Sequence, residues 1–119
     1  MDLTKEVQGI FKDYLGEVMS AADKVIPEVA KETAKKIKDT APRRKGSYAK
    51  SWSVKTDKKR IHVSSTVYAK APGYRLAHLL ENGHAKRGGG RVQGIPHIAP
   101  AEEWAAEEVV GRLQRAMTI

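Results

Sequence analysis

The sequence has no cysteine among its 119 residues, one phenylalanine and two tryptophans. The lack of cysteine excludes disulfides, thiolate metal sites and a cysteine nucleophile, and it agrees with a cytoplasmic site of synthesis. No apolar run reaches the roughly 18 residues of a membrane span, so we expect no transmembrane helix and no membrane partner. The opening stretch MDLTKEVQGIF has no basic region followed by an apolar one, so we expect no secretory signal.

Positive charge is in excess, and it gathers in the middle of the chain. The net charge is +8, and residues 35–60 hold eleven Lys or Arg against two Asp. Such a patch suits nucleic acid or an acidic protein surface, although a solvated face explains it equally well. The cations that we single out as contacts for either partner are Arg43, Arg44, Lys45, Lys58, Lys59 and Arg60.

The length fits a single domain over residues 1–119, and the apolar pattern predicts that it begins with a long helix. Apolar side chains recur every three or four positions over residues 3–38. Pro27 lies inside this pattern and clashes with the carbonyl of Asp23, so we expect a kink or a break near residues 23–27. A stripe this long in a small domain can need a partner helix or a neighbouring subunit to cover part of it.

The rest of the chain predicts a small sheet and two further helices. Apolar and polar residues alternate over 48–56 and again over 60–67, which predicts an antiparallel hairpin over 48–67 with a turn at 57–59. Short and long helical patterns cover 75–82 and 100–116, and Ile95–Ile98 is a candidate third strand. We therefore expect an α+β fold in which the two long helices pack on a small, mainly antiparallel sheet, with Trp52 in the core.

Residues 83–94 hold five glycines and three cations, which predicts a mobile basic loop between helices. The loop is not a phosphate-binding motif, because Gly89 and Gly90 stand where a P-loop needs Lys and Ser or Thr. His78, Glu81 and His84 have a spacing that suggests zinc, but Gly83 should end the helix between them. No nucleophile is paired with a base, so we expect no enzyme, no metal and no cofactor.

Glu81 is the one acidic residue between positions 58 and 101, among several cations. A half-buried carboxylate needs a partner, so we expect an ion pair or a helix-capping role, with a contact between subunits as the alternative. His97 is expected to anchor the loop to the last helix, and His78 to be half-buried.

An ordered set of short segments resembles a known family. The segments are Ala41-Pro42, Gly46-Ser47-Tyr48, Lys50-Ser51-Trp52, then Leu79 to Ala85, Gly89 to Val92 and Pro96 to Glu103. They resemble the small tail-component proteins of long-tailed bacteriophages, also called head–tail joining, neck or tail-completion proteins. The resemblance covers roughly residues 40–105.

The resemblance implies a structural virion protein of a phage or prophage at the head–tail junction. It implies a ring of identical subunits, such as a hexamer, which contacts connector and tail proteins and can be monomeric when free. Phage DNA in the lumen is a further candidate partner. The alternative is a nucleic-acid-binding module that uses the 35–60 patch with Tyr48 and Trp52. The residues that we expect at the assembly contacts are Glu81, His84, Lys86, Arg87, Arg91 and His97.

Overall fold

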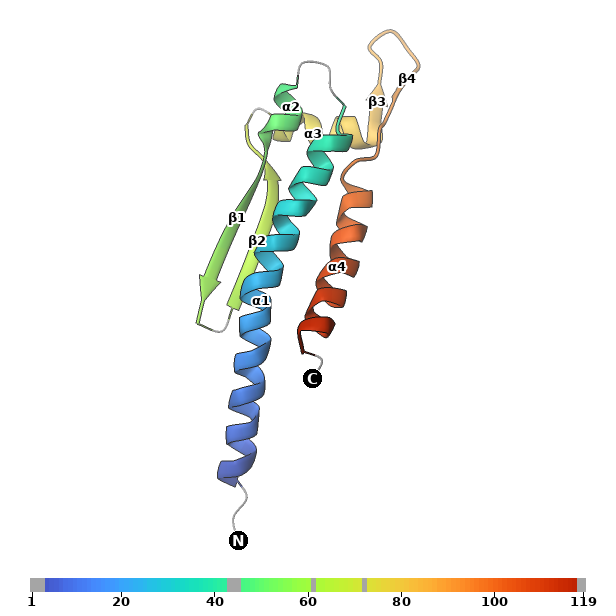
Figure 1. The fold of residues 1–119 in the computed structure, drawn as a ribbon. Helices are drawn as coiled ribbons and strands as arrows, with labels where there is room; N and C mark the ends of the chain where they lie inside the picture. Colours follow the sequence, from blue (N-terminus) through green and yellow to red (C-terminus); the bar gives the residue numbers. More distant parts are fainter. Residues whose placement is uncertain (1–3, 43–45, 61, 72, 118–119) are drawn as a thin grey trace.

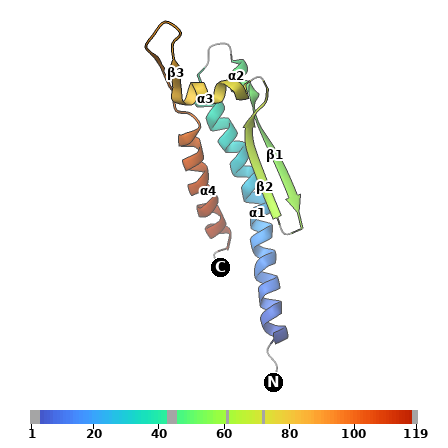
Figure 2. The same cartoon turned by 180° about the vertical axis from the view of Figure 1, so that it is seen from behind.

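A computed structural model describes residues 4–42, 46–60, 62–71 and 73–117 of the chain. Within these ranges the fold is α+β, as predicted. Helix α1 (Thr4–Thr40) lies between an antiparallel hairpin and helix α4 (Ala99–Met117), and Figures 1 and 2 show the hairpin and α4 on opposite sides of α1. Arg43, Arg44 and Lys45, residue 3 of the predicted first helix and residue 61 of the predicted hairpin lie outside the described residues.

Helix α1 continues through Pro27 as one element of 37 residues, so the predicted break into two helices is wrong. A proline removes a single backbone hydrogen bond, whereas α1 packs against both the hairpin and α4 and has buried side chains before and after Pro27, such as Val25 and Val29. The helix ends at Thr40, just before Ala41 and Pro42, because the residue that precedes a proline avoids helical backbone angles.

The hairpin begins four residues later than the alternation predicted. Tyr48 lies in a short helix, α2 (Ser47–Ser51), and strand β1 (Trp52–Lys59) follows it directly. Residues 57–59 belong to β1, so the turn predicted there is also wrong. Strand β2 (His62–Ala69) pairs antiparallel with β1 and places Trp52 opposite Ala69 and Val54 opposite Val67.

The core lies where the base of the hairpin meets α1 and the start of α4. Trp52 is buried there as predicted, together with Ile37 of α1, Tyr48 of α2 and Ala101 of α4. At the other end of the α1–α4 contact, Arg112 joins the two helices through Glu28 at 2.9 Å and Glu32 at 2.6 Å. Apolar packing and this ion cluster together hold α4 along α1.

Helix α3 (Tyr74–Asn82) ends at Gly83, which takes a φ of 78°, as the sequence predicted for a terminating glycine. Strands β3 (Gly83–Ala85) and β4 (Arg91–Gln93) follow. Residues 94–97 have no assigned secondary structure, so the third strand predicted at Ile95–Ile98 is absent from the described chain. A strand there would need a neighbour to pair with, whereas these residues instead donate to Glu81 and Leu80.

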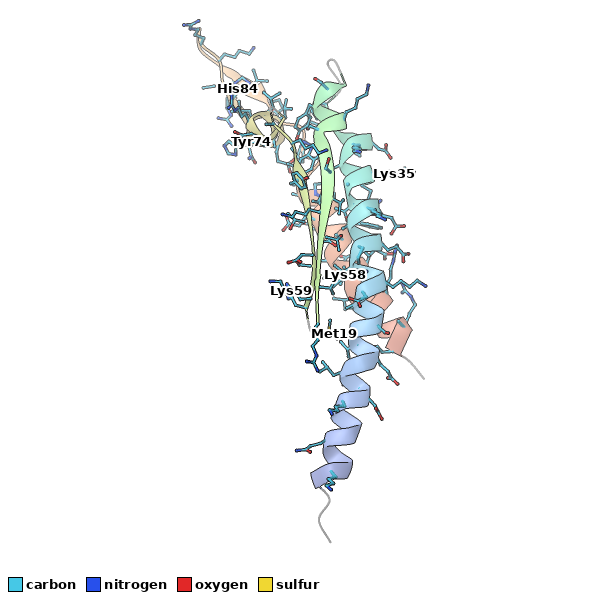
Figure 3. All side chains as sticks on the ribbon, turned by 90° about the vertical axis from the view of Figure 1, so that its left-hand side faces the viewer. Met19, Lys35, Lys58, Lys59, Tyr74 and His84 are labelled. Atoms are coloured by element: carbon cyan, nitrogen blue, oxygen red, sulfur yellow. The ribbon has the colours of Figure 1, made fainter. Side chains whose placement is uncertain are left out.

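The molecule is long and thin, with extents of 79 × 21 × 20 Å and a radius of gyration of 19.9 Å. A compact domain of this length would have a radius of gyration of about 13 to 14 Å. The first part of α1, residues 4–18, extends past the ends of the hairpin and of α4 (Figure 1), and Met19 marks its upper limit in Figure 3. We call residues 4–18 the projecting segment.

Candidate functional site: a basic arm on a buried hydrogen-bond network

Strands β3 and β4 form a short two-stranded arm, residues 83–93, at the end of the molecule opposite the N-terminus (Figure 1). The turn is closed by the N–H of Lys86, which donates to the carbonyl of Gly90 at 3.0 Å. Gly89 and Gly90 have φ values of 102° and 79°, a region that favours glycine. The loop predicted over 83–94 therefore contains a short two-stranded hairpin, because its glycines fold the segment back on itself. The mobility predicted for this loop stays a prediction.

Two further glycines allow the backbone to pass close to itself at the base of the arm. A side chain at Gly83 would collide with the carbonyl oxygen of Val92, and one at Gly94 would lie 2.5 Å from the carbonyl oxygen of Glu81. The N–H of Ile95 donates to the carbonyl of Leu80 at 2.8 Å and closes this base. The arm therefore leaves the body at a position fixed by backbone contacts.

Glu81 is the anchor beneath the arm. Its carboxylate accepts three backbone hydrogen bonds, from His97 at 2.7 Å, Ile98 at 2.8 Å and Ala99 at 2.9 Å. These N–H groups belong to the start of α4, where a helix leaves its first donors without partners. Glu81 thus caps α4 from α3, which agrees with the capping role that its isolated negative charge suggested.

The electrostatics of Glu81 follow from these contacts. Desolvation raises the pKa of Glu81, but the N–H groups of His97, Ala99 and Ile98 and the nearby His97 ring outweigh it and lower the pKa below its ordinary value. The carboxylate is therefore charged at neutral pH, and its charge lies at the positive end of the α4 dipole.

His97 connects Glu81 to the hydrophobic core. The ring is 1% exposed, and its Nδ1 lies 2.7 Å from the carbonyl oxygen of Ile95 and 3.1 Å from Glu81 Oε1. Both neighbours only accept hydrogen bonds, so Nδ1 must carry a proton. In the neutral ring Nε2 then accepts from the hydroxyl of Tyr48 at 2.6 Å. This places His97 as the predicted anchor between the arm and α4.

Tyr48 is the member of this network that the sequence missed. Its ring is 7% exposed and meets the rings of Trp52 and His97 edge to face. Burial raises the pKa of the Tyr48 hydroxyl; the Trp52 indole opposes this shift and the charge of Glu81 adds to it. Tyr48 and His97 are 49 positions apart, so no local pattern could have joined them. We call Tyr48, Glu81, Gly83, Gly94 and His97 the latch.

The other residues expected at assembly contacts lie on the arm itself. His84 is half-buried on β3, and Lys86, Arg87 and Arg91 are exposed. Arg91 also donates to the carbonyl of Asn82 at 3.1 Å, at the end of α3. The latch and the arm thus bring together all six predicted assembly residues, but Glu81 and His97 support the arm from within. His78, expected to be half-buried, is exposed and contacts Asn82.

Three of the basic residues predicted to contact nucleic acid, Lys58, Lys59 and Arg60, are described, and they lie far from the arm. Lys58 and Lys59 lie near the end of the hairpin, away from His84 (Figure 3), and Arg60 is exposed beside them. Tyr48 and Trp52 are both buried, so the interpretation that they stack on nucleic-acid bases is wrong. Both rings belong to the core, to which α2 contributes Tyr48 and the start of β1 contributes Trp52.

The described residues contain no group of three or more His, Asp or Glu placed to hold a metal ion. Within the same part of the chain, no helix combines the length and the apolar character needed to cross a bilayer.

Comparison with known proteins gives one family. Residues 5–83 match the HK97-gp10-like family, described as "Bacteriophage HK97-gp10, putative tail-component". The match spans α1, the hairpin and α3, and it stops where the arm begins. No curated protein and no solved structure matches the chain. Because the match covers most of the chain and agrees with the resemblance seen in the sequence, the chain belongs to the HK97-gp10-like family of bacteriophage tail components.

Proposed function

We propose that this tail component is a head–tail joining protein that assembles with copies of itself into a ring between the head connector and the tail. The observation that carries the proposal is the surface that one copy leaves uncovered. The chain exposes 9,075 Å², whereas a compact monomer of its mass exposes about 6,400 Å². A ring subunit needs two interface patches of about 800 Å² each, and the excess is large enough for both.

The projecting segment supplies the first patch. Leu15 lies on the same face of α1 as Ile26 and Val29, which contact the rest of the fold, but Leu15 is 50% exposed and Tyr14 58%. The apolar stripe of α1 therefore continues past the elements that cover it. An exposed stripe of this kind marks an interaction surface.

A groove of about 460 Å³ supplies a matching second patch. It is lined by apolar side chains of α1, β2 and α4, including Ile26, Val67 and Val109. The projecting segment and the groove are different surfaces of the same chain. A contact between them would be head to tail, which is the type of contact that closes into rings.

The arm would then contact the next protein along the joint, because it lies at the far end from the projecting segment. Lys86, Arg87 and Arg91 offer charge to an acidic surface or to DNA in the lumen. The two strands of the arm are already paired and its base is fixed. Ordering the arm on contact therefore costs less conformational entropy than ordering an irregular loop would.

The test is the mass of the protein in solution by light scattering, over a range of concentrations and at low and high salt. We expect a discrete multiple of 13.1 kDa at high concentration, because apolar contacts resist salt. Leu15→Gln should shift the equilibrium toward the monomer. Leu76→Gln is the matched control, since it removes an exposed leucine at the opposite end. A monomer at every concentration would contradict the proposal.

A further inference from the structure

Helix α1 separates its charges by face. Glu28 and Glu32 turn toward α4 and contact Arg112. Lys31, Lys35 and Lys38 lie on another side of the helix at positions i, i+4 and i+7, where side chains share one face. The acidic face is accounted for by the fold, because its carboxylates hold α4. Lys31 and Lys35 have no comparable contact with a carboxylate among the described residues.

The basic face forms one wall of an open groove of about 480 Å³ between α1 and the hairpin. Lys70 stands on the opposite wall with Ser53 and Tyr68, and Ala34, Trp52 and Val54 complete the lining. Among the described residues that line this groove there is no Asp or Glu. Among the described residues, no carboxylate lies within 4.0 Å of the amino group of Lys31, Lys35 or Lys70. We call this surface the lysine groove.

Like charges at positions i and i+4 of a helix repel each other and destabilise the helix. Lys31 and Lys35 stand in this relation, and Lys70 adds a further charge across the groove. A polyanion in the groove would turn this repulsion into attraction. We propose that the lysine groove binds the sugar–phosphate backbone of duplex DNA.

The composition of the groove favours DNA over an acidic protein. Lysines act as point charges that tolerate many phosphate positions, so a row of lysines suits the regular row of phosphates on a DNA strand. Ser53 and Tyr68 add hydroxyl donors, which commonly bond to phosphate oxygens. From Lys31 to Lys38 the helix rises about 10 Å, and a DNA strand carries one phosphate per about 3.4 Å. The row is therefore long enough to neutralise about three phosphates.

This inference goes beyond the proposed ring and does not depend on it. It also replaces the nucleic-acid surface expected from the sequence. The groove uses Lys31 and Lys70, which lie outside residues 35–60, and it does not need the end of the hairpin where Lys58 and Lys59 lie (Figure 3). Lys35, labelled in the same view, lies close to the opposite end of the hairpin.

The test compares two variants of equal net charge. K31Q/K35Q/K38Q removes the three lysine charges from the α1 side of the groove. K5Q/K12Q/R115Q removes three exposed charges elsewhere. Glutamine has nearly the helix propensity of lysine and arginine, so both variants should fold, and circular dichroism checks this. Binding to a short duplex DNA is measured by fluorescence anisotropy between about 50 mM and about 200 mM salt.

We expect the groove variant to weaken binding by at least about tenfold and to reduce the slope of log K against log salt by about 2 to 3. The control variant should keep most of the wild-type slope. Equal losses in the two variants would show attraction to net charge alone and would overturn the proposal. If polyglutamate displaces the labelled DNA at a lower charge concentration than unlabelled duplex DNA does, the groove is an acidic-peptide surface, and this would also overturn the proposal.

Light scattering on the same variants separates this inference from the proposed function. The lysine groove and the apolar groove have different linings apart from Trp52. K31Q/K35Q/K38Q should therefore assemble like the wild type even though its DNA affinity is lost. A variant that loses assembly and DNA affinity together would contradict a separate DNA site.

Discussion

The two ends of this molecule are stabilised in opposite ways. At the latch, a few polar groups and two glycines fix the positions of α2, α3, the arm and α4, and every residue involved has a specific partner. At the projecting segment, a regular amphipathic helix extends into solvent with Tyr14 and Leu15 exposed. The latch needs nothing beyond its own chain, whereas the projecting segment has the features of a surface that another chain completes.

The largest effect should come from adding a methyl group to the latch. In Gly94→Ala the new Cβ would lie 2.5 Å from the carbonyl oxygen of Glu81 and 2.6 Å from the backbone nitrogen of Gly83. Because both contacts are with backbone, the base of the arm must move, and we expect a loss of about 3 kcal/mol in the free energy of unfolding. Urea denaturation measures it.

Gly88→Ala is the matched control, because nothing lies within 4 Å of a Cβ at Gly88 and its φ is not in the left-handed region. Its free energy of unfolding should change by no more than about 0.5 kcal/mol. Equal effects of the two substitutions would show that the base of the arm is not closely packed.

Removal of the carboxylate beneath the arm should have the next largest effect. Glu81→Ala leaves three N–H groups at the start of α4 without an acceptor, and we expect a loss of about 2 kcal/mol. Glu81→Gln keeps one oxygen acceptor and should lose about half as much. If alanine and glutamine behave alike, the carboxylate does not cap α4.

The same carboxylate predicts a pH dependence. Because the pKa of Glu81 is lowered in the folded state, its contribution to stability is present above its unfolded pKa of about 4.3 and is lost as the pH falls through the folded pKa. Glu81→Gln should therefore differ from the wild type at pH 7 and approach it in acid. Thermal unfolding followed by circular dichroism at several pH values tests this.

A smaller effect is expected at Tyr48. Tyr48→Phe keeps the ring in the core but leaves Nε2 of His97 without its hydrogen bond, which should cost about 1 kcal/mol in unfolding free energy. Tyr14→Phe removes a hydroxyl from the exposed projecting segment and should leave stability unchanged. Chemical denaturation measures the unfolding free energy of both variants. A larger loss in Tyr14→Phe than in Tyr48→Phe would contradict the account.

The smallest effect on folding should be that of Leu15→Gln. Its side chain is half exposed in a single copy, so the unfolding free energy of dilute protein should change by no more than about 0.5 kcal/mol. Guanidinium unfolding at low protein concentration measures it. A loss of several kcal/mol would mean that Leu15 packs within its own chain, and the contrast between the two ends would fail.

The sequence predicted the elements whose signals are local. Regular apolar spacing identified α1, α3 and α4, and Gly83 identified the end of α3. It failed where contacts between distant residues decide the structure. Tyr48 lies in a helix rather than a strand, and its hydroxyl reaches His97, which is 49 positions away. The arm pairs across a turn whose glycines carry no alternating pattern.

The candidate site shows the same division. The isolated charge of Glu81 correctly suggested a capping role, since a single carboxylate among cations needs a partner. The lysine groove was not predicted as a unit, although the spacing of Lys31, Lys35 and Lys38 is visible in the sequence. Lys70 and Tyr68 come to it from the hairpin, and only the packing of the hairpin beside α1 places them there.

The most direct test of the difference between the ends is hydrogen exchange of backbone amides, in dilute protein and in concentrated protein. The account predicts slow exchange at Ile95, His97 and Ile98 in both conditions. It predicts fast exchange along the projecting segment in dilute protein and strong protection once copies associate. Slow exchange of the projecting segment in the monomer, or no gain in protection on association, would contradict the claim that a second copy completes this end.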